Sequence, residues 1–163
     1  MKNSFFNLAD EKRDRIISAA LFEFSRHGYE SGSLDRIVRR AAISKGGLYE
    51  YISSKQNLFL YLAEYSYDRL YDFITSHLEP GAALPADLID RIALVSRVAV
   101  DFYAKHPDII SFITVAGESN DLRMKEQVQT TFDSHFDALF GDSDWSNIAF
   151  DRDRVLELLK WLL

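Results

Sequence analysis

The sequence predicts an all-α fold, and three observations support this prediction. Apolar residues make up 47% of the 163 residues, whereas glycine and proline number only seven and three. Apolar side chains recur at intervals of three and four residues over most of the chain, which is the spacing of one face of an α-helix. Serine, asparagine or aspartate precedes several of these runs, as is typical of helix N-caps. We therefore expect a mostly helical protein with either one sizeable core or a small domain on a larger one.

A first helix is expected over residues 8–27. Asn7 can cap this helix, and Asp10 lies three residues further on, in the position of a capping box. Gly28 suits the left-handed conformation that often ends a helix. The apolar stripe that would face the core consists of Ile17, Ala20, Leu21 and Phe24.

The stretch SLDRIVRRAAISKGGLYEYISSK, residues 33–55, predicts two short helices joined by a tight turn. Ser33 can cap a helix over residues 34–41, and Ser44 can cap a second helix over residues 45–51. A helix-turn-helix of this kind can place its second helix in the major groove of DNA. Short helical hairpins with polar caps also occur in proteins that bind no DNA, so the pattern alone leaves both interpretations open.

A long helix is expected over residues 55–77. Its cap is either Ser53 paired with Gln56 or Ser54 paired with Asn57. The helix should end before EPGAALP, the segment of the chain that is richest in proline and glycine. This long helix would connect the N-terminal helices to the rest of the protein.

The rest of the chain predicts a bundle of further helices. They are expected over residues 86–105, from Pro107 onward, over 121–140 after a cap at Asn120, and from Asp151 to the end of the sequence. We divide the chain into a helix-turn-helix domain, residues 1–54, and a helical body, residues 55–163. Because the sequence stops at KWLL inside an apolar helix, we expect that a C-terminal portion of the body is missing.

Positive charge is concentrated around the helix-turn-helix. The formal net charge of the chain is −6, but residues 31–55 carry five basic and two acidic side chains. Residues 56–163, in contrast, carry nine basic and eighteen acidic side chains. A locally positive segment on an acidic body can bind a phosphate backbone while the body stays away from it.

Several classes of protein are disfavoured by the composition. The absence of cysteine excludes a disulfide framework, a thiolate metal site and a cysteine nucleophile. The four histidines show no metal-ligand spacing, and we found no nucleophile–base pair, paired carboxylates or phosphate-binding glycine loop. We therefore expect no enzyme activity, no metal and no cofactor. The N-terminus does not resemble a signal peptide and no apolar run could span a bilayer, which predicts a cytoplasmic protein that does not bind membranes.

The candidate DNA-binding residues lie in and beside the second short helix. Gly46 and Gly47 permit close backbone approach, at a cost of about 1 kcal/mol each in an isolated helix. Their neighbour Lys45 can reach a base or a phosphate. Hydroxyl and ammonium groups that can bind phosphates are supplied by Ser33, Ser44, Tyr49, Tyr51 and Lys55. Either tyrosine could instead be a packed core residue.

The run SLDRIVRRAAISKGGLYEYISSKQNLF resembles the N-terminal DNA-binding domain of the TetR family of bacterial transcriptional regulators. The resemblance implies a three-helix helix-turn-helix domain joined by a long helix to a helical ligand-binding and dimerisation bundle. It also implies that Tyr49, Tyr51 and Lys55 contact phosphates and that residues 45–47 lie at the base edges. The sequence departs from the family at Ala42, where the turn usually has glycine; alanine is compatible with the turn if its backbone stays right-handed. Ile52 stands where phenylalanine is usual.

The resemblance further implies a homodimeric repressor that binds a palindromic double-stranded DNA operator and is released by a small-molecule inducer. Aromatic side chains of the body that could line an apolar pocket for such a ligand are Phe102, Tyr103, Phe112, Phe132 and Phe136. The sequence favours plain core packing over a pocket for these aromatic residues. The alternatives are an activator or a protein-responsive regulator of the same fold, or a helical interaction protein that does not bind DNA.

Overall fold

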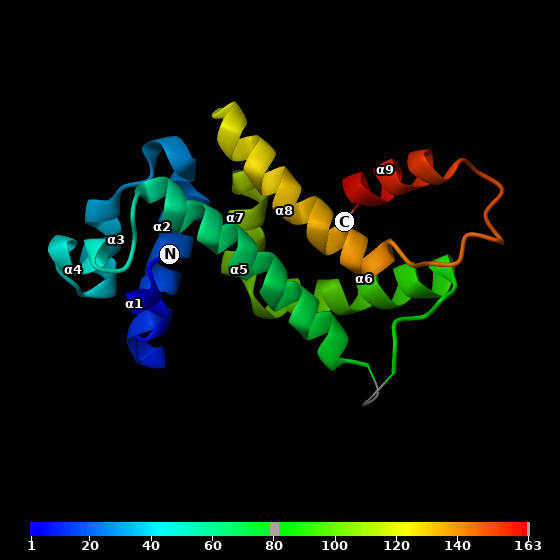
Figure 1. Ribbon diagram of the computed structural model, residues 1–163, viewed down its shortest axis with the longest axis horizontal. Helices are drawn as coiled ribbons and strands as arrows, with labels where there is room; N and C mark the ends of the chain where they lie inside the picture. The colour runs from blue at the N-terminus through cyan, green and yellow to red at the C-terminus, as the bar shows by residue number, and fades with distance from the viewer. Residues whose placement is uncertain (79–81, 163) are drawn as a thin grey trace. The chain divides into compact units, whose positions relative to one another are not determined.

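The computed structural model describes residues 1–78 and 82–162, and every regular element within these ranges is an α-helix (Figure 1). A single bridge between Asp87 and Asp144 is the only β-type pairing in the part of the chain that is described. The helices are α1 (Asn3–Phe6), α2 (Asp10–Ser31), α3 (Leu34–Ala41), α4 (Lys45–Tyr49), α5 (Lys55–Ser76), α6 (Leu88–Lys105), α7 (Pro107–Gly117), α8 (Leu122–Phe140) and α9 (Arg152–Leu162). This architecture confirms the all-α prediction.

The chain forms two compact units. Unit 1 contains residues Met1–Tyr67 and His106–Thr131, and unit 2 contains Asp68–Lys105 together with the described residues from Phe132 onward. Helices α5 and α8 each contribute residues to both units. Unit 1 includes the predicted helix-turn-helix, and it also includes α7 and the beginning of α8.

The N-terminal region differs from the prediction of one helix over residues 8–27. Asn7 does not cap that helix, because it is the residue that ends α1 and no side chain caps the start of α2. Helix α2 starts later, after Ala9, with two acidic residues in its first turn that suit the positive end of the helix dipole. Gly28 adopts a positive φ of 64° with a ψ of −174°, so the first helical segment is interrupted at this residue, as predicted, and a further short helical stretch continues to Ser31.

Helix α3 begins after Ser33 as predicted, although the Ser33 side chain makes no cap hydrogen bond. The condition of a right-handed backbone at Ala42 is not met: its φ and ψ are 54° and 47°, in the left-handed region. The cause is the way in which α3 ends. The N–H of Ala42 bonds to the oxygen of Arg39 and the N–H of Ile43 bonds to that of Val38, a pair of bonds that requires a left-handed residue directly after the helix.

The other helix starts follow the sequence with small shifts. Ser54 Oγ accepts from the N–H of Asn57, so the second of the two possible caps of α5 is the one used. Helix α7 has Pro107 in its first turn, as predicted. Helix α8 is capped by Asp121 instead of Asn120, because the Asp121 carboxylate accepts from the N–H groups of two residues in the first turn. The segment EPGAALP lies partly outside the described residues.

The core of unit 1 brings α2, α5 and α7 together around Phe59. The ring of Phe59 lies edge-to-face with Phe24 of α2 and with Phe112 of α7, with ring centroids 5.1 Å apart in both pairs. All three side chains are completely buried. The burial of each phenylalanine contributes about 1.5–3 kcal/mol to the free energy of unfolding. Helix α3 packs on α2 and contacts α4, so the helix-turn-helix rests on this aromatic core.

The core of unit 2 surrounds a buried arginine. Apolar residues of α5, α6, α8 and α9 pack together, with Ile74, Leu88, Val95, Phe136, Phe140 and Leu159 among them. Arg91 is 2% exposed, and its guanidinium donates to the backbone oxygens of Pro85 and Leu139 and to the Asp142 carboxylate. Because a buried guanidinium is costly without partners, these bonds explain why the core accepts it.

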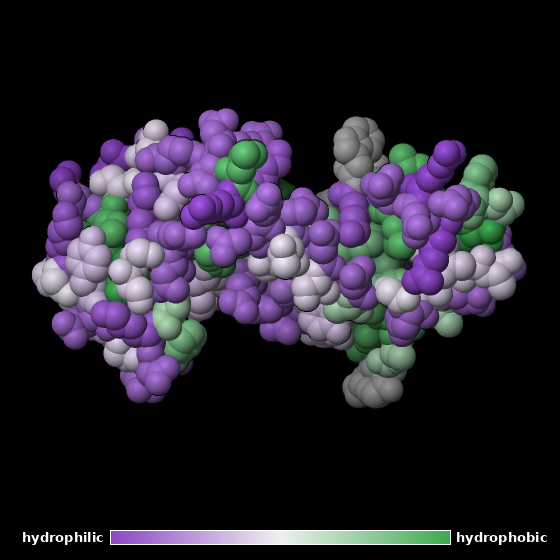
Figure 2. All heavy atoms as spheres, turned by 45° about the horizontal axis from the view of Figure 1, so that its top comes forward, coloured by the Kyte–Doolittle hydropathy of each residue, from purple (hydrophilic) through white to green (hydrophobic). Residues whose placement is uncertain are grey.

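The face of the protein drawn in Figure 2 is mostly hydrophilic, with small hydrophobic groups between the polar side chains. Among the described residues, no helix combines the length and the apolar character that crossing a bilayer requires.

Candidate nucleic-acid interface

Helix α4 is five residues long and presents its polar side to solvent. Ser44 Oγ accepts a hydrogen bond of 2.9 Å from the N–H of Gly47, which confirms the predicted cap. Leu48 is completely buried and attaches the helix to the core, whereas Lys45 and Gly46 are exposed. A β-carbon added at Gly46 would meet no atom within 4 Å, so nothing in the chain itself requires glycine there. The open space beside Gly46 therefore permits another molecule to approach the backbone closely.

Lys45 forms an ion pair with Asp35 of α3. Its Nζ lies 2.8 Å from the Asp35 carboxylate, and both side chains are more than half exposed. The hydrogen bond from Lys45 to Asp35, together with the opposite charge of Asp35, raises the pKa of the lysine. The ammonium is therefore charged and held beside the first turn of α4, where a phosphate or a base edge would compete with the water-exposed Asp35 carboxylate for it.

The two tyrosines occupy different environments. Tyr49 is 42% exposed, which disfavours the alternative that it is a core residue. Tyr51 is half-buried, and its hydroxyl accepts a 3.0 Å hydrogen bond from Nζ of Lys12, which also lies over the tyrosine ring at 5.2 Å from the centroid. Because Lys12 donates to the hydroxyl oxygen, the O–H group of Tyr51 can itself donate to another acceptor. Sequence reasoning missed Lys12, because it lies 39 residues before Tyr51, on α2.

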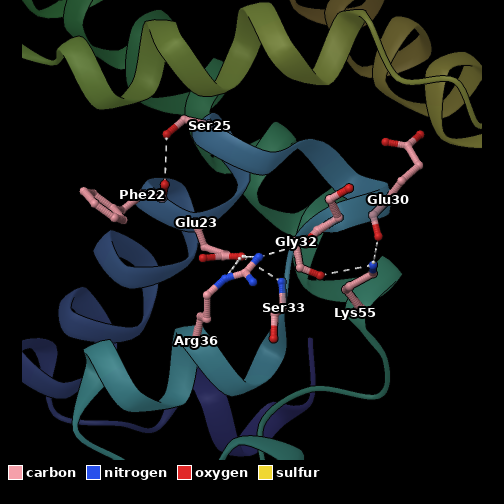
Figure 3. Close-up of polar contacts among 9 residues, drawn as sticks. Phe22, Glu23, Ser25, Glu30, Gly32, Ser33, Arg36 and Lys55 are labelled. Atoms are coloured by element: carbon pink, nitrogen blue, oxygen red, sulfur yellow. Dashed lines mark hydrogen bonds and ion pairs between the residues drawn. The ribbon is translucent and has the colours of Figure 1, made fainter.

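Ser33 is held by a buried carboxylate (Figure 3). Its backbone N–H donates to Glu23 Oε1 at 2.8 Å, and Nε of Arg36 donates to the same oxygen at 2.8 Å. Burial by itself would raise the pKa of Glu23, but the bonds from Arg36 and Ser33 and the charge of Arg36 outweigh burial and lower it. This ion pair joins the middle of α2 to the first turn of α3. Glu23 is not part of the apolar stripe of Ile17, Ala20, Leu21 and Phe24, and its periodicity alone does not indicate a role in this site.

Lys55, at the beginning of α5, is bonded to the end of α2 (Figure 3). Its Nζ donates to the backbone oxygens of Glu30, at 3.1 Å, and Gly32, at 3.3 Å, and lies 4.7 Å from the centroid of the Tyr29 ring. Only one of its three N–H groups is left for a phosphate. The structure thus gives Lys55 a second, structural task that the sequence did not indicate.

Glu30 also bonds to the turn between α7 and α8. Its Oε1 accepts from Ser119 Oγ at 2.9 Å and from the backbone N–H groups of Asn120 and Asp121 at 3.0 and 3.1 Å. A hydrogen bond from its own backbone amide lowers the pKa of Glu30, burial opposes this, and the three bonds from the turn lower it further. Together with Lys55, Glu30 ties three segments of unit 1 to each other.

The five aromatic residues of the predicted ligand pocket are divided between the two units. Phe112 belongs to unit 1, where it packs on Phe59. The other four belong to unit 2: Phe102 lies against Tyr103, with centroids 5.8 Å apart, and Phe132 lies against Phe136, also at 5.8 Å. The pKa of Tyr103 is raised by burial. Their role as a pocket stays a prediction.

Within the described residues, no group of three histidine, aspartate or glutamate side chains could hold a metal ion.

Comparison with known proteins identifies the family. Residues 16–62 match the family model described as "Bacterial regulatory proteins, tetR family". The chain is 33% identical over 115 residues, 69% of its length, to the HTH-type transcriptional repressor NicS of Pseudomonas putida, of which this covers 50%. It is 38% identical over 131 residues, 80% of its length, to the HTH-type transcriptional activator FasR of Mycolicibacterium smegmatis, of which this covers 58%. The chain thus spans about half the length of these curated relatives.

Solved structures show the same fold. A TetR family transcriptional regulator from Chloroflexus aurantiacus superposes on 99% of the chain with a TM-score of 0.71 and 24% identity, over 76% of its own length. The regulator FadR from Bacillus subtilis, in complex with stearoyl-CoA, covers 91% of the chain with a TM-score of 0.68 and 14% identity, over 79% of its own length. A γ-butyrolactone receptor covers 93% with a TM-score of 0.63 and 22% identity, over 76% of its own length. The matched helix-turn-helix, the regulators among its relatives and the shared fold lead to one conclusion: the chain belongs to the TetR family of bacterial transcriptional regulators.

Proposed function

We propose that the protein is a sequence-specific DNA-binding transcriptional regulator that acts as a homodimeric repressor and leaves a palindromic operator when a small apolar ligand binds. The observation that carries the DNA-binding proposal is the exposed first turn of α4. There Lys45 and Gly46 face solvent, while Ser44 caps the helix and the buried Leu48 attaches it to the domain. This is the part of a helix-turn-helix that reads base edges in the major groove.

The proposal assigns roles to the residues around this turn. Residues 45–47 would lie at the base edges, and phosphates on either side would be bound by Ser33, Ser44, Tyr49, Tyr51 and Lys55. Residues 1–54 would form the DNA-binding domain and residues 55–163 the ligand-binding and dimerisation domain. A dimer is expected because one five-residue helix makes too few base contacts to specify a site, and two-fold symmetry doubles them.

Selection from randomised duplexes tests the DNA-binding proposal. We expect the purified protein to enrich a palindrome whose half-sites are one helical turn apart. Lys45→Ala should change the preferred bases. Lys105→Ala is a matched control, because Lys105 is as exposed as Lys45 and pairs with Asp101 at 2.7 Å in the same way. No enriched sequence, or the same change with both variants, would contradict the proposal.

Ligand release is supported by the solved structures, of which one contains stearoyl-CoA and another is called a γ-butyrolactone receptor. We expect long-chain acyl-CoA or a lactone to shift the protein from operator DNA to the free form in a fluorescence anisotropy titration. Phe136→Ala should reduce this response if the aromatic residues of unit 2 line the ligand site. If Phe136→Ala releases operator DNA on ligand addition as the wild type does, these aromatic residues only pack the core.

Activation is the second candidate, and the similarity to the activator FasR favours it. A promoter fusion carrying the selected operator distinguishes the two functions. Deleting the gene should raise reporter expression if the protein represses and lower it if the protein activates.

A further inference from the structure

Residues at the N-terminus of the chain hold the end of α4. The backbone N–H of Lys2 donates to the oxygen of Tyr51 at 2.9 Å, and its Nζ donates to the oxygen of Tyr49 at 2.6 Å. Between these two, Ser4 Oγ donates to the oxygen of Glu50. Three consecutive carbonyls, those of the last residue of α4 and of the two residues after it, are therefore bonded to residues more than forty positions earlier in the sequence.

This N-terminal segment is itself anchored in unit 1. Phe5 of α1 is completely buried, and its ring lies edge-to-face with Tyr61 of α5, with centroids 5.2 Å apart. Phe6 contacts the same tyrosine at 6.0 Å but is 53% exposed. Because Phe5 is fixed in the core, the donors of Lys2 and Ser4 are held in place against the end of α4.

Helix α4 needs such support for two physical reasons. A five-residue helix is far below the length at which helices are stable on their own, and two of its residues are glycine. In addition, the last carbonyls of any helix lack partners within the helix, and a lysine ammonium there satisfies them and complements the negative end of the dipole. Ser44 secures the start of α4 and Leu48 its middle; the N-terminal segment secures its end.

We infer that residues 2–6 form a clasp that fixes the orientation of α4, so that Lys2 and Ser4 are positioning residues for sequence reading. The inference rests on the proposed function, since it takes α4 to be the helix that reads DNA. A loosened α4 would lose the aligned base contacts of the operator complex. Binding to DNA of any sequence, which depends on phosphates, would persist. Loss of discrimination is thus the signature of a broken clasp.

The test uses the full chain without an N-terminal tag. Three variants are compared with the wild type: deletion of residues 2–6, Lys2→Met with Ser4→Ala, and Lys2→Arg as the conservative control. For each, the Kd for the selected operator and for a scrambled duplex is measured over a series of salt concentrations. Circular dichroism melting shows whether the protein is folded, and amide hydrogen exchange follows Leu48, Glu50 and Ile52, whose N–H groups bond within this helical turn.

The deletion should weaken operator binding about tenfold or more, as expected for the loss of charge-assisted hydrogen bonds, and leave the scrambled duplex within about twofold. The double variant should show the same pattern to a smaller extent, and Lys2→Arg should resemble the wild type. Exchange at the three amides should become faster in the deletion and in the double variant. The salt slope should stay unchanged, because no phosphate contact is lost.

Two results would overturn the clasp. If Lys2→Met with Ser4→Ala weakens both duplexes equally and lowers the salt slope by about 1, Lys2 is a phosphate contact. If the deletion changes neither operator affinity nor amide exchange, α4 does not depend on the N-terminal segment. Should the wild type itself select no sequence, the proposed function fails separately, and the exchange measurement still decides whether residues 2–6 hold α4.

Discussion

The ammonium of Lys55 lies 3.1 Å from the backbone oxygen of Glu30, and this bond joins the start of α5 to the end of α2. The carboxylate of the same glutamate bonds to Ser119 in the turn before α8. A residue predicted to bind phosphate is therefore also part of the internal framework of unit 1. Changes at Lys55 should accordingly affect both DNA binding and stability.

Lys55→Ala should weaken binding to all duplexes similarly and reduce the salt slope by about 1, because one N–H of the ammonium is free for a phosphate. It should also lower the free energy of unfolding by about 1–2 kcal/mol through the loss of two hydrogen bonds from a charged donor. A salt titration and urea denaturation measure the two effects. Lower stability with an unchanged salt slope would mean that Lys55 is purely structural.

Ala42→Gly should stabilise the protein. The left-handed backbone of Ala42 places its β-carbon close to a carbonyl oxygen, which costs about 1–2 kcal/mol for a residue other than glycine. Glycine adopts this conformation freely but loses more entropy on folding, so a net gain of about 0.5–1 kcal/mol is expected. Urea denaturation measures it. A decrease in stability would show that the backbone at this turn is not left-handed in solution.

The sequence predicted the helices around residues 33–55 well because their boundaries depend on local caps. Ser44 and Ser54 both accept hydrogen bonds from residues three positions on, and such contacts can be recognised from spacing alone. Cap spacing did not reveal the conformation of Ala42. That conformation depends on the two backbone bonds that end α3, donated by Ala42 and Ile43, and no side-chain cap signals them. Cap spacing failed at Asn7 because nothing in the local pattern separates α1 from α2.

The parts of the candidate site that the sequence did not indicate all depend on long-range contacts. Lys12 beside Tyr51, Glu23 beside Ser33 and Lys2 beside Tyr49 are pairs that only the folded chain brings together. Each of these partners carries a charge and lies either off the predicted apolar stripe of the first helix or before that helix. Sequence spacing could not distinguish charged side chains that bond to residues of the candidate site from charged side chains that are only exposed to solvent.

Gly46→Ala separates close approach to DNA from helix stability. The added methyl group meets nothing within 4 Å in the protein, and alanine favours a helix over glycine by about 1 kcal/mol. Thermal stability should therefore rise or stay equal, while operator affinity should fall because the methyl group obstructs the backbone's approach to the bases. At Gly47 the methyl group would lie 3.0 Å from Ser44 Oγ, so that variant also disturbs the cap. Unchanged operator affinity of Gly46→Ala would show that the bases do not lie against the backbone of Gly46.

Asp35→Asn tests whether the ion pair with Lys45 competes with DNA. The exposed pair contributes little to folding, so the melting temperature should hardly change. Freed from the carboxylate, Lys45 should bind operator more tightly and with a steeper salt dependence, which a salt titration by anisotropy measures. The double variant with Lys45→Ala should lose this gain. An equal gain without Lys45 would attribute the effect to the removal of a negative charge from the surface as a whole.

Glu30→Gln should make the protein less stable at neutral pH and less sensitive to acid. The folded-state pKa of Glu30 lies below its usual value of 4.5, so the stability it contributes is fully present above pH 4.5 and disappears as the pH falls through the lower folded-state pKa. The difference in free energy of unfolding between wild type and variant should therefore be constant above about pH 5 and shrink below pH 4.5. Urea denaturation from pH 7 to pH 3 measures this difference. Ser119→Ala removes one of the donors to the carboxylate and should reproduce part of the effect, because fewer bonds then favour the ionised form. A difference between wild type and Glu30→Gln that stays constant down to pH 3 would show that the carboxylate is not bonded to the α7–α8 turn in solution.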